Sequence, residues 1–204
     1  MIPSSIVKCG GSLLDWPELP TALATWLDTI SGPVAIIVGG GKVVDALRAL
    51  HEIHQTGEES SHWRALRAMD ITATVLCEKM PYTRPWKGVM PPWLSGTHST
   101  ACQRWVVQPS NWAEGLALSG MDTHLPRSWA TSSDSLALQM AHSWKCTRLF
   151  LLKSATPTSA SDWGANAKAH YVDSVFPNLV RSIETPPEII CINLRNWPVD
   201  ATTI

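Results

Sequence analysis

Two short stretches near the start of the chain each place a run of glycines directly after an apolar segment. The first covers residues 6–14 and reads IVKCGGSLL. The second is the apolar run at 33–38, which is followed by three glycines at 39–41 and by Lys42. A continuous apolar run is typical of a strand buried on both faces of a parallel sheet. Apolar residues at 43, 44, 47 and 50 then recur with helical spacing. Two such strand–glycine–helix units predict an α/β fold.

Both glycine runs should lie at one edge of the sheet, because the carboxyl ends of parallel strands lie together and open α/β sheets bind ligands there. Glycines allow backbone N–H groups to approach an anion, and a helix N-terminus adds positive potential. Lys8 supplies a full charge beside Gly10 and Gly11, and Ser12 is able to cap the next helix. The pattern indicates an anion site, with an ordinary strand-to-helix turn and an exposed lysine as the alternative.

Two common nucleotide motifs do not fit the second glycine run. A P-loop that ends at Lys42 would need glycine at position 36 and serine or threonine at position 43, where isoleucine and valine stand. A dinucleotide-binding fingerprint that begins at Gly39 would need glycine or alanine at position 44, which is valine. Neither motif explains the three glycines.

Length and charge exclude several classes of partner. A chain of 204 residues suits one domain or one compact two-lobed unit. Its 16 basic and 17 acidic residues give a formal charge of −1, and no basic block offers nucleic acid a binding surface. The N-terminus lacks the apolar run of a secretory leader, and no stretch approaches the roughly eighteen apolar residues of a membrane span. We therefore expect a cytoplasmic protein with neither a nucleic-acid nor a membrane partner.

Two further polar clusters lie at the ends of expected elements. Hydroxyl residues at 131–133 precede Asp134 just before a helical pattern begins. Ser132 or Ser133 could simply cap that helix, but an aspartate at a helix start can also orient lysines around a phosphoryl group. Lys153 and Ser154 follow the apolar strand expected at 148–152. The lysine is either an exposed strand end or a second cation for phosphoryl transfer.

The remaining pattern predicts helices at about 15–30, from Gly41 to about 54, at 62–80 and at 171–180, and strands at 104–108 and 188–193. Asp70 lies among apolar and small residues of the third helix, either as a solvated flank or as a polar group aimed at a substrate. Residues 81–102, rich in Pro, Gly and Trp, predict a loop or lid rather than a pair of strands. His51 and His54 have no partner at a diagnostic metal spacing, so we predict no metal site and leave the roles of His51 and His98 open.

Taken together, these segments resemble the amino-acid kinase family, which includes acetylglutamate, aspartate and uridylate kinases. The resemblance is carried by residues 7–13 (VKCGGSL), 38–41 (VGGG) and 131–137 (TSSDSLA), whose order and spacing cover most of the chain. It is sharper to short members similar to the archaeal kinase of methanofuran biosynthesis. Three segments carry that closer resemblance, at 61–70 (SHWRALRAMD), 125–129 (LPRSW) and 172–177 (VDSVFP).

The resemblance implies a three-layer α/β/α sandwich with a mainly parallel sheet, and ATP-dependent phosphoryl transfer in which Mg²⁺ accompanies ATP. It implies one domain over residues 1–204, with an acceptor and phosphate half at about 1–125 and a nucleotide half at about 126–204. The implied catalytic residues are Lys8 and Asp134, which we expect to face the ligand edge and not the core. The implied phosphate and nucleotide contacts are Gly10, Gly11, Ser12, Lys153 and Ser154, and the implied substrate contacts are Gly39, Gly40, Gly41, Asp70 and Ser133.

The closer resemblance also implies an acceptor. In the methanofuran-pathway relative the acceptor is an aminomethylfuran that already carries one phosphate, and the product is its diphosphate. This implies a role in furan-type cofactor biosynthesis for one-carbon metabolism, and the family resemblance allows a homo-oligomer. The chain departs from the family after residue 152, where the family usually carries the ATP-contacting loop TDVDGVY and this chain reads KSATPT. Lys153 is the first candidate for a compensating cation and Lys168 the second.

Two other functions stay open beside the small-molecule kinase. A non-catalytic ligand-binding or regulatory protein could retain the kinase fold and lose productive ATP binding, and the altered loop at 153–158 favours this. A uridylate-kinase-like or aspartate-kinase-like enzyme with another acceptor is the further alternative, although the segment at 61–70 favours the short relatives. The intact set of Lys8, Gly10, Gly11 and Asp134 favours the kinase, which is the function that we predict.

Overall fold

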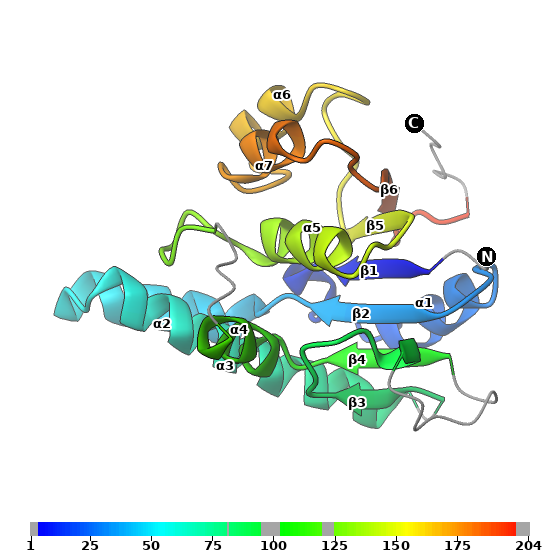
Figure 1. Cartoon of the computed structure of the whole chain (residues 1–204), viewed down its shortest axis with the longest axis horizontal. Helices are drawn as coiled ribbons and strands as arrows, with labels where there is room; N and C mark the ends of the chain where they lie inside the picture. Colours follow the sequence, from blue (N-terminus) through cyan, green and yellow to red (C-terminus); the bar gives the residue numbers. More distant parts are fainter. Residues whose placement is uncertain (1–3, 81, 95–102, 120–124, 199–204) are drawn as a thin grey trace.

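A six-stranded sheet in which every paired strand is parallel forms the centre of the computed structural model, in the order β3-β4-β2-β1-β5-β6 (Figure 1). The structure describes residues 4–80, 82–94, 103–119 and 125–198. The strands are β1 (Ser5–Cys9), β2 (Val34–Val38), β3 (Arg84–Trp86), β4 (Arg104–Val107), β5 (Arg148–Lys153) and β6 (Glu188–Asn193). The helices are α1 (Leu19–Leu27), α2 (Gly41–His54), α3 (Glu58–Lys79), α4 (Pro109–Leu118), α5 (Ser133–Ser143), α6 (Trp163–Lys168) and α7 (Phe176–Ser182), with the 3₁₀ turns η1 (Gly11–Leu13) and η2 (Pro92–Leu94).

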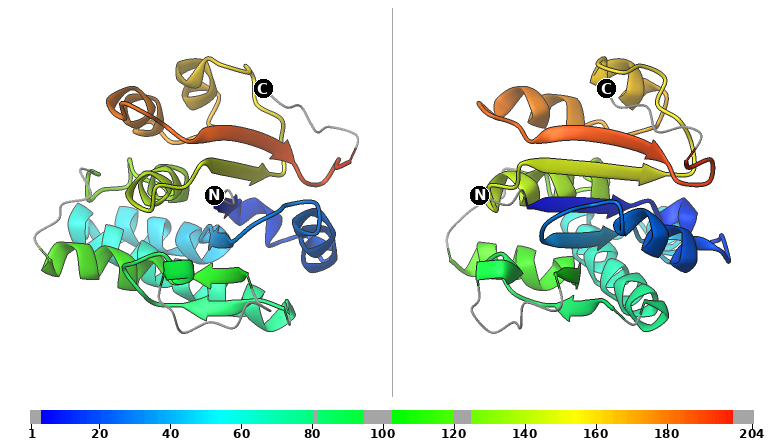
Figure 2. Two further views of the ribbon diagram at one scale, coloured as in Figure 1. Left: turned by 45° about the vertical axis from the view of Figure 1, so that its right-hand side comes forward. Right: turned by 90° about the vertical axis from the view of Figure 1, so that its right-hand side faces the viewer.

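Helices cover both faces of the sheet, and each face buries its own apolar cluster (Figure 2). Ile6 and Leu149 lie in the cluster that includes residues of α5 and α7. Val7 and Phe150 lie in the other cluster, which includes residues of α1. Neighbouring residues of a strand thus enter opposite clusters, as the alternation of side chains in a strand requires. The predicted three-layer α/β/α sandwich with a parallel sheet is confirmed.

Strand alternation also sets the direction of the two candidate lysines. Lys8 follows Ile6 by two residues in β1, and Lys153 follows Leu151 by two residues in β5. Ile6 and Leu151 both belong to the cluster that includes α5. Because residues two apart in a strand share a face, both lysines project toward the α5 side. Since β1 and β5 are direct neighbours, the two lysines come together at the carboxyl edge of the sheet.

Most predicted helices and strands are present, with shifted ends. α2 and β6 occupy the expected ranges. α3 begins at Glu58 instead of residue 62, because Gly57 is its N-cap and two glutamates lie in its first turn, where carboxylates are favoured. The helix expected at 15–30 shortens to Leu19–Leu27, and the glycine turn after β1 continues into η1. Ser12 lies inside η1, and the expected cap on a following helix is therefore wrong.

The segment expected as a loop at 81–102 contains a strand. β3 pairs with β4 in parallel, and Pro85 lies opposite Val106. β3 is one of the two edge strands of the sheet, where proline is tolerated because one side of the strand needs no hydrogen-bonded neighbour. The expectation that this segment forms no strand pairing is therefore wrong for residues 84–86. His98 lies outside the described residues.

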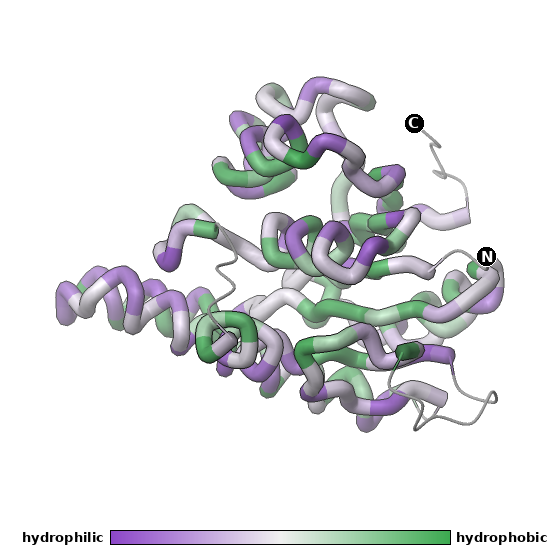
Figure 3. The backbone as a smooth tube through the Cα atoms, in the orientation of Figure 1, coloured by the Kyte–Doolittle hydropathy of each residue, from purple (hydrophilic) through white to green (hydrophobic). Residues whose placement is uncertain are grey.

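α2 extends from the body of the molecule and mixes polar and apolar residues, whereas apolar residues concentrate along the strands (Figure 3). None of its residues is buried, and Leu50 and Ile53 are 49% and 71% exposed. Its contacts run mainly along α3. In the described part of the chain, no helix is both long and apolar enough to cross a membrane.

Candidate functional site

Three charged side chains meet at the carboxyl edge of the central strands. The Lys8 Nζ atom lies 2.8 Å from one carboxylate oxygen of Asp134, and the Lys153 Nζ atom lies 2.7 Å from the other. The side chains of Lys8, Asp134 and Lys153 are 5%, 6% and 12% exposed. One carboxylate therefore bridges two nearly buried ammonium groups that come from neighbouring strands. The structure brings together the three residues that the sequence offered as separate polar signals.

The environment of this cluster shifts the protonation equilibria of its members. Burial alone would raise the pKa of the Asp134 carboxyl, but the positive charges of Lys8 and Lys153 outweigh it and hold the pKa below its usual range. Burial, reinforced by the neighbouring charge of Lys8, lowers the pKa of Lys153 to about 8, although Asp134 opposes the shift. Asp134 is thus an ionised anchor for the lysines and is unsuited to take up a proton.

Local structure explains how Asp134 reaches this position. Asp134 lies in the first turn of α5, and the side chain of the N-cap residue Ser132 accepts the Asp134 N–H at 3.2 Å. An aspartate in the first turn is favoured by the helix dipole. Lys153 also donates to the main-chain carbonyl of Tyr171, and its Nζ atom lies 5.0 Å from the centre of the Tyr171 ring. The cap that the sequence predicted and the charge cluster are therefore the same feature.

The two glycine runs pack directly against each other beside the charge cluster. A Cβ atom on Gly11 would lie 2.5 Å from the backbone nitrogen of Gly41, and one on Gly39 would lie 2.6 Å from the nitrogen of Gly11. Gly41 also has a φ of +51°, which favours glycine. The Gly10 and Gly39 N–H groups donate to Leu152 and Cys9 carbonyls, both at 2.8 Å. The expectation that the Gly10 N–H is offered to a phosphate is therefore corrected.

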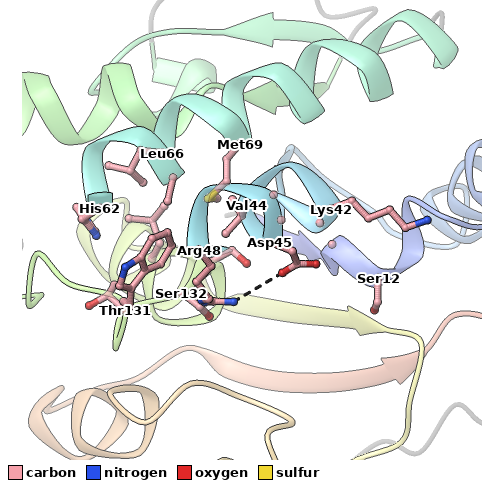
Figure 4. A pocket seen from close by; sticks show the side chains of 18 of the residues that line it. Ser12, Lys42, Val44, Asp45, Arg48, His62, Leu66, Met69, Thr131 and Ser132 are labelled. Atoms are coloured by element: carbon pink, nitrogen blue, oxygen red, sulfur yellow. Dashed lines mark ion pairs between the residues drawn. The ribbon is translucent and has the colours of Figure 1, made fainter. Parts of the chain in front are cut away.

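A cavity of about 410 Å³, here called the glycine cavity, opens beside these glycines (Figure 4). Its polar lining includes residues 39–41, the α5 N-cap residue Ser132 and Ser133. Leu66, Met69 and Leu136 form an apolar wall. The N-termini of α2 and α5 both border this space, so their dipoles give it positive potential. The cavity therefore combines polar residues at two helix N-termini with an apolar wall.

A second cavity of about 270 Å³, here called the lysine cavity, lies on the other side of η1. Lys8 and Lys153 border it, and Ser154, Thr156 and Thr158 contribute hydroxyl groups. The Ser12 and Ser154 hydroxyl oxygens lie 2.8 Å apart. Gly11 and Ser12 line both cavities. The glycine turn therefore contributes to both linings, and Lys8 and Lys153 line the lysine cavity alone. The lysine cavity also includes Gly10, Gly11, Ser12, Ala155, Ala169, His170 and Tyr171.

Asp70 lies away from both cavities. Its two carboxylate oxygens accept hydrogen bonds from the backbone N–H and the hydroxyl of Ser110, in the first turn of α4. The proposed substrate contact is therefore replaced by a link between α3 and α4. His51 is also absent from the lining of both cavities and shares hydrogen bonds with Thr56 and Ser61.

Part of the glycine cavity comes from α2 residues that were not predicted from the sequence. Val44, Asp45 and Arg48 line it together with the predicted Gly41, and the spacing of three, one and three residues is that of one helix face. That spacing could have identified them. A guanidinium nitrogen of Arg48 lies 3.7 Å from a carboxylate oxygen of Asp45. The central carbon of the same guanidinium lies 5.0 Å from the centre of the Trp129 ring. The contact with Trp129 could not be read from spacing, because it joins segments far apart in the chain.

The side chains around the two cavities fit an anionic phosphate donor better than a metal held by protein ligands. Phosphate oxygens suit the ammonium and hydroxyl groups of the lysine cavity. Among the described residues, no group of three His, Cys, Asp or Glu side chains is arranged to hold a metal ion. Asp134 is already occupied by two ammonium groups. The donor set does not fit a metal bound by the protein alone.

No protein-family profile matches the chain. No curated protein sequence matches it either. Its structure is similar to solved uridylate kinases. It matches the Archaeoglobus fulgidus enzyme at a TM-score of 0.60 and 13% identity, covering 94% of this chain and 92% of that one. It matches UMP kinase from Bacillus anthracis at a TM-score of 0.63 and 12% identity, covering 97% of this chain and 90% of that one. It matches UMP kinase from Ureaplasma parvum at a TM-score of 0.58 and 10% identity, covering 96% of this chain and 92% of that one. At these identities the likeness establishes a shared fold, the amino-acid kinase fold.

Proposed function

We propose that this chain, which has the fold of the uridylate kinases, is an ATP-dependent kinase of a small anionic molecule. The observation that carries the proposal is that Gly11 and Ser12 line two cavities, one of which is also lined by two lysines that a single carboxylate holds. Phosphoryl transfer needs positioning and charge stabilisation more than covalent chemistry, and this arrangement supplies both. The lysine cavity would take the phosphates of ATP, and the glycine cavity would take the acceptor.

The roles of the residues follow from their positions. Lys8 and Lys153 stabilise negative charge on the phosphoryl group as it passes between the cavities. Asp134 keeps both ammonium groups in place and takes no proton. An anionic acceptor oxygen attacks the phosphorus, and the bond from that phosphorus to the bridging oxygen of the donor breaks. Mg²⁺ would accompany ATP through phosphate oxygens, as it commonly does in kinases.

The shape and charge of the glycine cavity restrict the acceptor. Its rim of glycines and helix N-termini suits a phosphate or carboxylate, and its apolar wall suits a compact body. A phosphorylated aminomethylfuran of methanofuran-type cofactor biosynthesis is the acceptor that we propose, on the resemblance of residues 61–70, 125–129 and 172–177. UMP is the competing acceptor, and the fold shared with uridylate kinases supports it.

A thermal-shift series with ATP–Mg²⁺, followed by an acceptor screen, tests this proposal. A ligand that binds only the folded state must raise its apparent stability, by about 2.7 kcal/mol when its concentration is a hundred times the dissociation constant. We expect a saturable rise of the melting temperature with ATP–Mg²⁺. We then expect ADP release with phosphorylated aminomethylfuran and little with UMP. The reverse preference would support the uridylate-kinase-like alternative.

The absence of any shift up to millimolar ATP would contradict the kinase. The altered loop at 153–158 gives this outcome a specific structural basis, because Ala155, Thr156 and Thr158 from that loop line the lysine cavity. The same series with inorganic phosphate would then identify the non-catalytic alternative. A rise of the melting temperature with phosphate and none with ATP would indicate an anion-binding protein that keeps the kinase fold.

A further inference from the structure

The Asp173 side chain lies next to the charge cluster and accepts six hydrogen bonds. One of its carboxylate oxygens accepts the Ser132 N–H at 3.1 Å, the Ser132 hydroxyl at 2.8 Å and the Ser135 N–H at 3.1 Å. The other oxygen accepts the Ser135 hydroxyl at 2.6 Å and the N–H groups of Val175 and Phe176, both at 3.0 Å. Every lone-pair direction of this carboxylate is therefore engaged.

Most of these bonds hold residues on either side of Asp134. Ser132 is the N-cap of α5 and accepts the Asp134 N–H, while Ser135 directly follows Asp134. Four of the six hydrogen bonds to Asp173 come from these two serines. A cap of α7 alone would need only the two bonds from Val175 and Phe176. The extra four fix the backbone of Asp134 from both sides.

The same turn also holds one of the lysines. Tyr171, two residues before Asp173, accepts a hydrogen bond from the Lys153 ammonium through its main-chain carbonyl. Residues 171–173 therefore contact Lys153 at one end and the first turn of α5 at the other. The positions of the Asp134 carboxylate and of the Lys153 ammonium therefore both depend on this short segment.

We propose that Asp173 is a positioning residue for phosphoryl transfer, because it fixes the first turn of α5 so that Asp134 stays between Lys8 and Lys153. Its catalytic meaning rests on the proposed function, whereas its geometric effect on Asp134 does not. The Asp173 carboxylate oxygens accept all six hydrogen bonds. Asparagine would replace one of these oxygens by an NH₂ group, whose N–H would face the N–H and O–H donors that the oxygen accepts.

The protonation of Lys153 reports directly on this geometry. The charged or titratable groups that face its ammonium are Lys8 from β1, Asp134 from α5, the Tyr171 side chain and the Cys191 thiol from β6. Among these, the negative charge of Asp134 favours the ammonium form. If Asp134 moves away, the pKa of Lys153 must fall, because burial and the charge of Lys8 then act with less opposition.

The test is a pH titration of the full chain labelled with ¹³C at the lysine Cε atoms, with the Lys153 signal assigned by Lys153→Arg. In Asp173→Asn we expect the Lys153 midpoint to fall by about one pH unit or more. Asp162→Asn is the matched control, because Asp162 accepts a hydrogen bond from Ala165 at the start of α6 and contacts no member of the charge cluster. Its Lys153 midpoint should equal that of the parent protein.

An unchanged Lys153 midpoint in a folded Asp173→Asn variant would overturn the proposal and leave Asp173 as a cap of α7. Ser135→Ala serves if Asp173→Asn fails to fold, since it removes one hydrogen bond to Asp173 and keeps the carboxylate. We expect a smaller fall in the same direction, and no fall would overturn the proposal. The titration needs no nucleotide. Failure of ATP to bind would therefore refute the proposed function without altering this result.

Discussion

Burial decides what the three charged residues of the site can do. Lys8 and Asp134 are both buried, so they lie beneath the ligand edge and form part of the core as well. The expectation that they face the edge and not the core is therefore corrected. Buried charges are tolerated when they are paired, and removing one partner leaves the other uncompensated. Each substitution in this cluster should affect both stability and phosphoryl transfer.

Lys8→Ala and Asp134→Asn should each lower the rate of phosphoryl transfer by at least about a hundredfold, because both remove charge stabilisation at the moving phosphoryl group. Asp134→Asn should also lower the free energy of unfolding by about 3–5 kcal/mol, since it leaves two buried ammonium groups without a counter-charge. Urea unfolding and transfer assays check the two effects. Lys79→Ala, at an exposed lysine, is the control. Turnover that persists in either variant would contradict the assigned roles.

Lys153 predicts opposite pH trends for stability and activity. Its pKa is about 8 in the folded protein against 10.5 without the surrounding structure, because burial and Lys8 disfavour the charge. The unfolded chain therefore binds more protons between these values, and stability should rise with pH by about 1–2 kcal/mol from pH 7.5 to 9.5. The transfer rate should fall above about pH 8 as the ammonium is lost. Urea unfolding and rate profiles against pH, for the parent protein and Lys153→Met, check this. An equal rise of the free energy of unfolding with pH in the two proteins would contradict it.

At the scale of elements, the site depends on how closely the two glycine turns approach. The turn after β1 and the start of α2 come from consecutive strand–helix units, and their backbones touch at Gly11 and Gly41. No side chain fits between them. The closeness of these turns places α2, with Arg48 on its inner face, along the glycine cavity.

Gly11→Ala should lower the free energy of unfolding by more than about 2 kcal/mol, because its Cβ atom would lie 2.5 Å from backbone and cannot move aside as a side chain could. We also expect the rise of melting temperature with ATP–Mg²⁺ to disappear. Gly57→Ala is the matched control, because its Cβ would meet only the Ser60 hydroxyl at 3.4 Å. Equal stabilities of the two variants would show that the turns can separate without cost.

Asp70 is expected to act on helix packing and not on the substrate. Its carboxylate binds the first turn of α4 through Ser110, and burial raises its pKa. Asp70→Ala should therefore lower the free energy of unfolding by about 1–2 kcal/mol, as the loss of a helix cap does. The thermal shift with ATP–Mg²⁺ should be unchanged. Loss of acceptor binding at unaltered stability would instead restore the role predicted from sequence.

At the scale of the whole molecule, each cavity takes residues from both sides of residue 125, and the division into an acceptor half and a nucleotide half stays a prediction. The glycine cavity takes Trp129 and Leu136 from the second half of the chain, and the lysine cavity takes Lys8 and Gly10 from the first. A parallel sheet explains this, because β1 lies between β2 and β5 and brings both halves to one edge. The homo-oligomer and the cytoplasmic location stay predictions.

Local sequence patterns predicted five of the six strands, the glycine turns after β1 and β2, and the positions of Lys8 and Lys153 at the carboxyl ends of buried strands. These follow from local rules, because apolar runs form buried strands and alternation assigns each residue a face. The folded structure was needed to show that Asp134 bridges both lysines, that Arg48 contacts Trp129 and that Asp70 contacts α4. Each of these is a contact between elements far apart in the chain, and its geometry depends on how the helices pack on the sheet, which no local pattern encodes.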